Sequence, residues 1–429
     1  MRFDTLSAWL SWMSRPGPRA IDLGLERVGE VWRRLGPPVL AAPVLTVAGT
    51  NGKGSSVAFA EAILQGAGYR TGCYTSPHLL HYNERIRIDG EPADDSRICA
   101  AFDRIDHARG DIHLTYFEFG TLAALCLFAD AGLDALVLEV GLGGRLDAVN
   151  LVDPDVALIT SIGLDHQDWL GPDLESIGRE KAGIMRPGRL AVFSGRAMPH
   201  SVADQARLLG ARLLVAGIDY RVERRDLDWD LHGPGGSRCA LPLPGMRGPV
   251  QVDNAAGVLV ALDGLRQRLP LDQRAVRAGL LGARVRGRFE VHPGAPTWVL
   301  DVAHNPQAAA VLSDTLGQLF CRGRRIAVCA ILADKDAGAV AQALAGRFDH
   351  WLLAGLEDSG RGQSAARLEA RIRAYTGTAL VETSGSVAEA MNQAAALAGD
   401  DDQVVVFGSF LTVSAAMDWL ESKSHGAGG

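Results

Sequence analysis

The stretch Val44-Leu-Thr-Val-Ala-Gly-Thr-Asn-Gly-Lys-Gly-Ser-Ser56 decides the fold. Val44–Ala48 is a short apolar run typical of a buried strand, and the glycine-rich turn after it leads directly into a helical pattern. Glycines let successive backbone N–H groups point at phosphate oxygens, the helix N-terminus adds partial positive charge, and Lys53 neutralises the outer phosphates. We therefore expect a phosphate-binding loop in which Ser55 or Ser56 offers a hydroxyl to a metal ion.

The spacing of this loop departs from the usual G-x-x-x-x-G-K-[ST] pattern, because Val47 stands at the first glycine position and Gly54 follows the lysine. An ordinary glycine-rich turn between a strand and a helix is the alternative interpretation. Three glycines, one lysine and two serines within Gly49–Ser56 favour phosphate binding over that alternative.

Short β-rich apolar runs alternate with helical patterns on both sides of the loop, which is typical of doubly wound parallel sheets in an α/β fold. The helical patterns include 55–65 and 252–269. The predicted strands are Val44–Ala48, Thr71–Tyr74, Ala135–Val140, Val156–Ile162 and Leu190–Ser194 in the first half, and Trp298–Val302, Arg325–Ile331, His350–Leu353 and Gln403–Phe407 in the second.

The break between these two series predicts two domains, 1–287 and 297–422, joined by a Gly/Pro-punctuated linker at 288–296. Residues 212–249 carry Asp and Arg runs, glycines and prolines, so we expect irregular structure or a small antiparallel excursion there. The Gly-rich end, 423–429, is expected to be a disordered tail.

Composition narrows the range of partners. The chain has 43 basic and 50 acidic residues, a net charge of −7, and no stretch that gathers Lys and Arg among aromatic residues, so a nucleic-acid partner is not expected. No apolar run approaches the length of a membrane span, and the N-terminus lacks a secretory signal pattern. The six cysteines show no metal-type spacing, so we expect reduced thiols in a cytoplasmic monomer.

Polar residues stand at the carboxyl ends of three predicted strands, where ligands bind in open parallel sheets. Ser76 follows Tyr74, Glu139 closes an apolar strand, and His166 lies just past Ile162. A carboxylate at the end of an apolar strand is costly unless it is paired, hydrogen-bonded or bound to metal, and beside phosphates that metal would be magnesium. Ser76 as a turn former and His166 as a hydrogen-bonded loop residue are the alternatives.

These residues belong to a wider set of motifs that resembles the bacterial dihydrofolate synthase/folylpolyglutamate synthase family of the Mur ligase superfamily. The motifs span nearly the whole chain: Ile21-Asp-Leu-Gly-Leu-Glu-Arg-Val28, Gly49-Thr-Asn-Gly-Lys-Gly54, Thr75-Ser-Pro-His-Leu79, Asn83-Glu-Arg85, Thr115-Tyr-Phe-Glu118, Leu138-Glu-Val-Gly-Leu-Gly-Gly-Arg-Leu-Asp147, Asp165-His166, Arg179-Glu-Lys-Ala-Gly183, Asp253-Asn-Ala255, Gly287-Arg-Phe289 and Asp301-Val-Ala-His-Asn-Pro306.

The resemblance implies an N-terminal P-loop ATPase-like domain and a C-terminal Rossmann-like domain that ligates glutamate. It also implies a set of ligand contacts. Ser76, Glu139 and His166 match magnesium ligands, and two ions are expected. ATP contacts match Gly49, Thr50, Asn51, Gly52, Lys53, Gly54, Ser55, Asn254, Arg288 and Asp301. Pterin-substrate contacts match Ile21, Asp22, Leu23, Thr115, Tyr116, Phe117, Glu118, Leu146, Asp147 and Ala148.

Lys181 matches a lysine that the family carries as a carbamate, and the alternative is that Lys181 pairs with Glu180 or another helix carboxylate. The ability of a buried lysine to shift its pKa is the physical support for the carbamate. His304 follows a predicted strand end and is a candidate general base by position, while Asn305-Pro306 also suits a simple turn before a helix.

The function that the resemblance implies is ATP-dependent ligation of L-glutamate to dihydropteroate or a reduced folate through an acyl phosphate. Lys53, Lys181 and His304 are the expected catalytic residues. A Mur ligase of peptidoglycan precursors has the same chemistry with another acceptor, but the motifs at 21–28 and 115–118 resemble the folate branch. A nucleotide-dependent switch ATPase is a further alternative, and it would turn over ATP without an amino acid.

Overall fold

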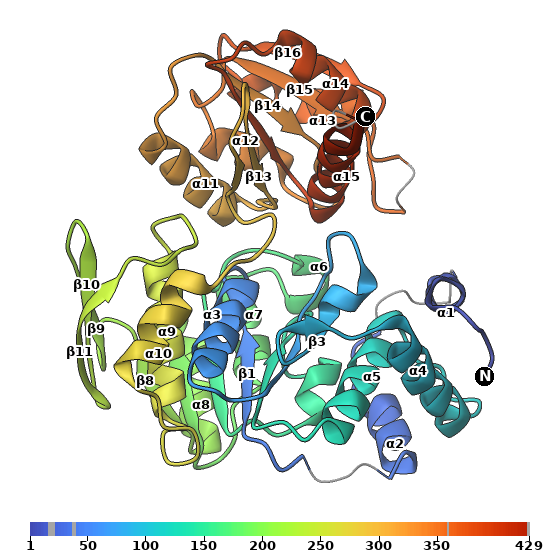
Figure 1. The fold of residues 1–429 in the computed structure, drawn as a ribbon, viewed down its shortest axis with the longest axis vertical. Coiled ribbons are helices and arrows are strands. Elements are labelled where there is room, and N and C mark those ends of the chain that lie inside the picture. Colours follow the sequence, from blue (N-terminus) through green and yellow to red (C-terminus); the bar gives the residue numbers. More distant parts are fainter. Residues whose placement is uncertain (16–21, 37–39, 358–359, 427–429) are drawn as a thin grey trace. The chain divides into compact units, whose positions relative to one another are not determined.

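The computed structural model describes residues 1–15, 22–36, 40–357 and 360–426 (Figure 1). The chain forms two compact units. Unit 1 comprises Met1–Gly245 and Gln251–Arg284, and unit 2 comprises Met246–Val250 and Val285–Gly429. Both units are α/β structures with largely parallel sheets, so the predicted two-domain fold class is confirmed.

The main sheet of unit 1 has the strand order β4-β3-β2-β5-β1-β6-β7-β8 among the described residues. Its strands from β2 through β8 in this order run parallel, while β3 pairs antiparallel with both β2 and β4. The bounds are β1 Val44–Ala48, β2 Thr71–Tyr74, β3 Ile86–Ile88, β4 Glu91–Pro92, β5 Ala135–Glu139, β6 Val156–Ile159, β7 Leu190–Phe193 and β8 Arg212–Val215.

Helices of unit 1 cover this sheet, and α3, α9 and α10 pack together over β1, β5, β6 and β7. The large side chains of Trp9, Phe102 and Phe119 lie fully buried in a core cluster that α1, α4 and α5 share with the sheet. The helices are α1 Leu6–Met13, α2 Glu26–Arg34, α3 Lys53–Gly66, α4 Asp95–Arg109, α5 Tyr116–Asp130, α6 Gln167–Leu170, α7 Leu174–Ala182, α8 His200–Leu209, α9 Gln251–Asp263 and α10 Gln273–Gly282, with short 3-10 turns at Tyr82–Arg85 and Ala148–Leu151.

The segment 212–249 contains both a parallel strand and an antiparallel sheet. β8 continues the main sheet beside β7, and β9 Arg221–Arg224, β10 Asp228–Gly233 and β11 Gly236–Pro242 then form a three-stranded sheet of their own. The predicted antiparallel excursion therefore begins only after β8.

Unit 2 contains a sheet of order β12-β13-β17-β14-β15-β16, in which β12 is antiparallel and the other pairs are parallel. Trp351, Phe348 and Phe407 pack ring against ring in its core. The bounds are β12 Glu290–His292, β13 Thr297–Asp301, α11 Pro306–Gln318, β14 Arg325–Cys329, α12 Ala337–Ala343, β15 His350–Ala354, α13 Ala365–Ile372, β16 Leu380–Ser384, α14 Val387–Leu397, β17 Gln403–Phe407 and α15 Phe410–Gly426, with a 3-10 turn at Arg373–Tyr375.

Two boundary regions differ from the expectation. The segment 288–296 is not a free linker, because β12 lies within it and pairs with β13 as an edge strand of unit 2. The helix α15 continues to Gly426 and so includes residues 423–426 of the expected tail, and residues 427–429 lie outside the described residues. Among the residues that are described, no helix is both long and apolar enough to cross a membrane.

Candidate active site

The phosphate loop joins β1 to α3 with the geometry that anion binding requires. Gly52 is the N-cap of α3, has φ +91°, and contributes no side-chain cap to the first turn of the helix. A Cβ atom at Gly52 would lie 2.7 Å from the side-chain oxygen of Asn254, so glycine is required on steric as well as conformational grounds. The helix N-terminus therefore presents its backbone N–H groups beside Asn254, which comes from α9.

Two lysines meet at one backbone oxygen of this loop. The Nζ atoms of Lys53 and Lys181 each donate to the carbonyl of Gly49 at 3.0 Å, and Lys53 also reaches the carbonyl of Thr50 at 3.3 Å. Burial, together with the nearby charge of Lys53, lowers the pKa of Lys181 to about 7. The Glu180 carboxylate, one of the alternative partners predicted for Lys181, instead pairs with Arg145 at 2.8 Å.

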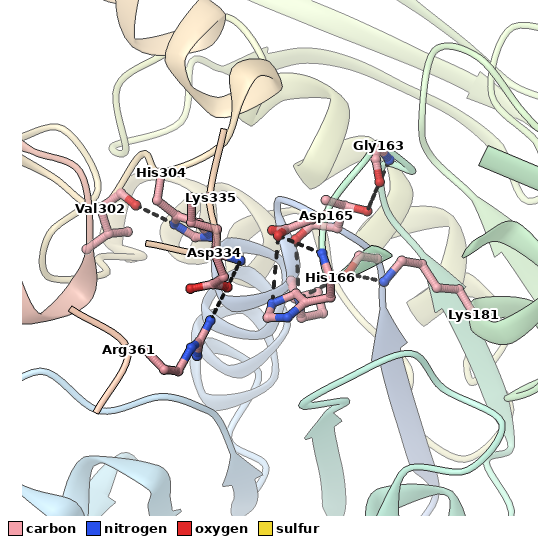
Figure 2. A network of polar contacts seen from close by, with 12 residues as sticks. Gly163, Asp165, His166, Lys181, Val302, His304, Asp334, Lys335 and Arg361 are labelled. Atoms are coloured by element: carbon pink, nitrogen blue, oxygen red, sulfur yellow. Dashed lines mark hydrogen bonds and ion pairs between the residues drawn. The ribbon is translucent and has the colours of Figure 1, made fainter. Parts of the chain in front are cut away.

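The phosphate loop is fixed to the segment that follows β6. The Thr50 hydroxyl donates to the carbonyl of Gly163 at 3.1 Å and accepts from its N–H at 3.0 Å, and Thr160 donates to the carbonyl of Asn51 at 2.7 Å. The same segment continues to Asp165 and His166, which lie side by side in Figure 2. The backbone of His166 has φ +53°, and its N–H donates to the Asp165 carboxylate at 2.9 Å. His166 is therefore held in a left-handed conformation that is uncommon for a residue with a side chain.

The residues expected to hold a metal ion include oxygen donors of the kind that bind hard cations. Glu139 is 4% exposed at the end of β5, and its Oε2 accepts the backbone N–H of Ser76 at 3.2 Å. Its oxygens lie 3.9 to 4.0 Å from the position that a Cβ of Gly54 would take, so the carboxylate faces the start of α3. The hydroxyl of Ser56, in the first turn of this helix, is buried without a protein partner. Carboxylate and hydroxyl oxygens beside a phosphate loop are the donors that magnesium prefers.

The segments expected to hold the pterin substrate converge in unit 1. The guanidinium of Arg27 bonds to the carboxylates of Asp22 at 2.8 Å and of Glu118 at 3.0 Å, and the N–H of Gly24 donates to the carbonyl of Leu146 at 3.2 Å. The three predicted segments are therefore linked through Arg27 and Gly24, which follow the first of them. Leu23 and Ala148 lie within these segments, and Ile21 lies outside the described residues.

Thr115 and Glu118 also have a structural role that was not predicted from the sequence. The Thr115 hydroxyl accepts the N–H of Glu118 at 3.2 Å, and the Glu118 carboxylate accepts the N–H of Thr115 at 2.7 Å. This capping box starts α5. The rings between them point elsewhere: Phe117 packs against Gly141 and Tyr74, while Tyr116 lies beneath the guanidinium of Arg85.

Asp147 is a buried carboxylate beside the two lysines. It accepts the N–H of Leu142 at 2.8 Å and the N–H of Val149 at 2.9 Å. Burial raises its pKa to about 6, against the opposing effect of these backbone bonds and of Lys53. The expected substrate segment 146–148 thus carries an acidic group that is electrostatically coupled to the phosphate loop.

In unit 2 the expected residues lie at the carboxyl end of β13. The Asp301 carboxylate accepts the N–H groups of Phe289 and Ala303, both at 2.8 Å, and burial raises its pKa although Arg288 is close. The Nδ1 atom of His304 lies 2.8 Å from the carbonyl oxygen of Val302 (Figure 2). A carbonyl only accepts, so Nδ1 carries the proton and Nε2 is the basic nitrogen of the neutral ring.

Asn305 has the structural role that the turn alternative described. Its side chain accepts the N–H of Ala308 at 2.9 Å as the N-cap of α11, and Pro306 occupies the first helical position. This cap fixes the backbone that carries His304.

Sequence reasoning missed a charged loop at the carboxyl end of β14. Lys335 is 7% exposed, its Nζ lies 3.8 Å from Asp334, and Asp334 also pairs with Arg361 (Figure 2). The same strand-end argument that selected Glu139 applies to Asp334-Lys335-Asp336, which follow the predicted strand 325–331 within five residues. A buried ammonium at this edge is a candidate for binding a carboxylate.

Comparison with known families agrees with this geometry. Residues 47–194 match the model of the Mur ligase middle domain, and residues 287–410 match the Mur ligase glutamate ligase domain. The chain is therefore a member of the Mur ligase family, a class of ATP-dependent amide-forming ligases.

Its relatives define the branch. The dihydrofolate synthase/folylpolyglutamate synthase of Escherichia coli is 45% identical over 98% of this chain and 97% of its own. The structure of E. coli FolC in complex with DHPP and ADP has a TM-score of 0.92 at 44% identity and covers 98% of this chain and 99% of that one. A bifunctional folylpolyglutamate synthase/dihydrofolate synthase with Mn, AMPPNP and L-glutamate bound has a TM-score of 0.89 at 45% identity, covering 97% and 98%. Within the class, this chain belongs to the dihydrofolate synthase/folylpolyglutamate synthase family.

Proposed function

We propose that this enzyme ligates L-glutamate to dihydropteroate and to reduced folates with ATP, working as a monomer in the cytoplasm. The observation that carries the proposal is the convergence in unit 1 of a phosphate loop, two lysines at the Gly49 carbonyl, and the three bonded segments around Arg27 and Asp147. ATP-dependent glutamate ligation to folates is supported by relatives that bind ADP, DHPP, AMPPNP and glutamate.

The first step activates the acceptor. A carboxylate oxygen of the acceptor attacks the γ-phosphorus of ATP, a new P–O bond forms, and the bond to the ADP oxygen breaks. Lys53 and the N–H groups at the start of α3 neutralise the charge that develops on the transferred phosphoryl group. The ligands assigned to magnesium, Ser76, Glu139 and His166, would hold up to two ions, which supply further charge neutralisation at the phosphates when bound.

The second step forms the amide. The amine of glutamate attacks the acyl carbon, the C–O bond to phosphate breaks, and phosphate leaves with the second proton that the amide nitrogen gives up. The attacking amine must first lose a proton, and we assign the acceptor of that proton to Nε2 of His304, the basic nitrogen of its neutral ring. Asn254 in unit 1, and Arg288 and Asp301 in unit 2, are assigned to the nucleotide, and Lys335 to a carboxylate of glutamate.

An acceptor assay tests the activity directly. With ATP, magnesium and glutamate, we expect dihydropteroate and a reduced folate each to gain a glutamyl unit, detected by mass, and ADP to form in step with glutamate consumption. A peptidoglycan-type ligase would leave both acceptors unchanged, and a switch ATPase would release ADP without glutamate. A mass gain on only one acceptor would show a monofunctional enzyme.

We further propose that Lys181 is carbamylated. In the modification, the neutral amine forms a C–N bond to the carbon of CO2 and releases one proton, and the product is an anionic oxygen donor beside the phosphate loop. The pKa of about 7 keeps a large fraction of the amine neutral at physiological pH, whereas an exposed lysine stays protonated.

The carbamate predicts a signal that depends on pH. With 13C-labelled bicarbonate, the wild-type protein is expected to show a carbamate carbon resonance in 13C NMR that grows as the pH rises through about 7, because the neutral amine is the reactive form. Lys181→Arg should abolish the resonance, and the control Lys423→Arg, at an exposed lysine, should retain it. Equal spectra for the wild type and Lys181→Arg would rule the carbamate out.

A further inference from the structure

A largely buried ion pair joins the short strand β3 to the helix of the phosphate loop. The guanidinium of Arg87 on β3 bonds to Glu61 on α3 through Nη2 at 2.7 Å and through Nε at 3.1 Å to both carboxylate oxygens. The side chains are 20% and 11% exposed. Glu61 lies about two helical turns beyond Lys53, so the pair attaches β3 to the body of α3.

The remaining arm of Arg87 reaches the segment that carries an assigned metal ligand. Its Nη1 donates to the Thr75 hydroxyl at 3.2 Å and to the carbonyl of Glu84 at 3.1 Å, and the Thr75 hydroxyl donates to the same carbonyl at 3.3 Å. The next residue after Thr75 is Ser76, whose N–H bonds to Glu139. β2 and β5 are parallel neighbours, and Tyr74 lies opposite Leu138. The next residues on the two strands, Thr75 and Glu139, therefore lie next to each other at the carboxyl edge of the sheet.

Packing alone does not account for this arrangement. A buried ion pair adds little stability over apolar side chains of similar volume, since desolvation offsets the attraction. Arg87 instead makes hydrogen bonds to three different segments, on α3, on the loop after β2, and on the turn before β3. Burial lowers the pKa of Arg87, but the bonded carboxylate of Glu61, together with Cys73 and Glu139, outweighs burial and raises the pKa, so the guanidinium also lies within electrostatic reach of the assigned metal ligand.

We infer that Arg87, oriented by Glu61, is a positioning residue for the divalent metal and nucleotide: it holds Thr75, and through it Ser76 and Glu139, against the phosphate-loop helix. The inference rests on the proposed function, because it takes Ser76 and Glu139 as metal ligands. Residues that orient metal ligands without touching the metal commonly change metal affinity about 10- to 100-fold when removed.

The test measures metal binding without turnover. Mn2+ affinity is determined by electron paramagnetic resonance in the presence of AMPPNP, and thermal unfolding is recorded for every variant. The double variant Arg87→Met/Glu61→Leu replaces the ion pair with apolar side chains, so its melting temperature is expected to stay near that of the wild type. Its Mn2+ dissociation constant is expected to rise about tenfold, because Thr75 has lost its donor. Thr75→Val is expected to show a smaller rise in the same direction.

Two comparisons decide between positioning and packing. Arg87→Lys, which can pair with Glu61 but cannot reach Thr75 and Glu84 at the same time, is expected to keep a melting temperature near that of the wild type and only part of the Mn2+ affinity. The control Arg104→Met/Asp130→Leu removes an exposed ion pair of the same unit and should change neither quantity. Wild-type Mn2+ affinity in a folded Arg87→Met/Glu61→Leu protein, and equally in Thr75→Val, would overturn the inference.

The assigned metal site has its own control. Glu139→Ala should abolish the high-affinity Mn2+ signal if that carboxylate is a ligand. If the signal persists in Glu139→Ala, the assigned site is wrong and the inference fails with it. If Glu139→Ala loses the signal while the Arg87 and Thr75 variants keep it, only the positioning role of Arg87 is overturned.

Discussion

Lys53→Ala is expected to reduce the rate of ADP formation by about 10²- to 10³-fold or more while the protein remains folded. The proposed mechanism assigns the Lys53 ammonium to the outer phosphates, so removing it should leave the developing charge of the transferred phosphoryl group without its assigned side-chain partner. The fold should tolerate the change, because Lys53 donates to backbone carbonyls of its own loop, at Gly49 and Thr50.

The same substitution should have a second effect, on Lys181. Because the charge of Lys53 helps to lower the pKa of Lys181, its removal should raise that pKa and shift the onset of the carbamate resonance to higher pH. ADP release, the 13C resonance and thermal unfolding are measured on one sample. Lys423→Ala, at an exposed lysine of α15, is the matched control. A folded Lys53→Ala enzyme with wild-type turnover would remove Lys53 from the site.

Glu139→Ala is expected to abolish amide formation, with a loss of at least about 100-fold, the upper end of what removal of an outer metal partner costs. The buried carboxylate is an assigned metal ligand and also the acceptor for the N–H of Ser76, so its loss should remove one assigned ligand and release another. Glu139→Gln keeps the volume and can still accept from Ser76, yet should remain inactive because it lacks the charge.

Measurement of both glutamyl product and ADP identifies the step that fails. If the metal and phosphates are no longer held, both products should fall together in Glu139→Ala. The control is Glu30→Ala, which removes a surface carboxylate paired with Arg33 and Arg34 and should leave both rates unchanged. Glutamyl transfer near the wild-type rate in Glu139→Gln would show that the carboxylate charge is dispensable.

The central strands were predictable from sequence because they are buried on both faces. β1, β2 and β17 have exactly the bounds that their apolar runs indicate, and all their residues are buried. Edge strands lack this signal. β4 has only two residues, both exposed, and β16 carries mostly exposed side chains, so nothing in their local composition distinguishes them from loops.

Strand ends and loop chemistry are enough to predict Lys53, Glu139 and His304 as candidate site residues, and these assignments stay predictions. The pairing of Arg87 with Glu61 could not be predicted in this way, because the partners are 26 residues apart on elements whose packing the sequence pattern does not specify. Residues 288–296 were interpreted as a linker because their glycine and proline content is typical of one. Only the pairing of Glu290–His292 with β13 shows that these residues form a strand.

The capping box at the start of α5 restricts how this enzyme could be redesigned for new acceptors. The Glu118 carboxylate accepts the N–H of Thr115 and pairs with the guanidinium of Arg27 at the same time. Most substitutions of Glu118 would therefore destabilise the first turn of α5 rather than change the choice of acceptor. Tyr116 and Phe117 take no part in the cap through their rings. Directed evolution of acceptor choice should therefore keep Thr115 and Glu118 constant and randomise the two aromatic positions between them.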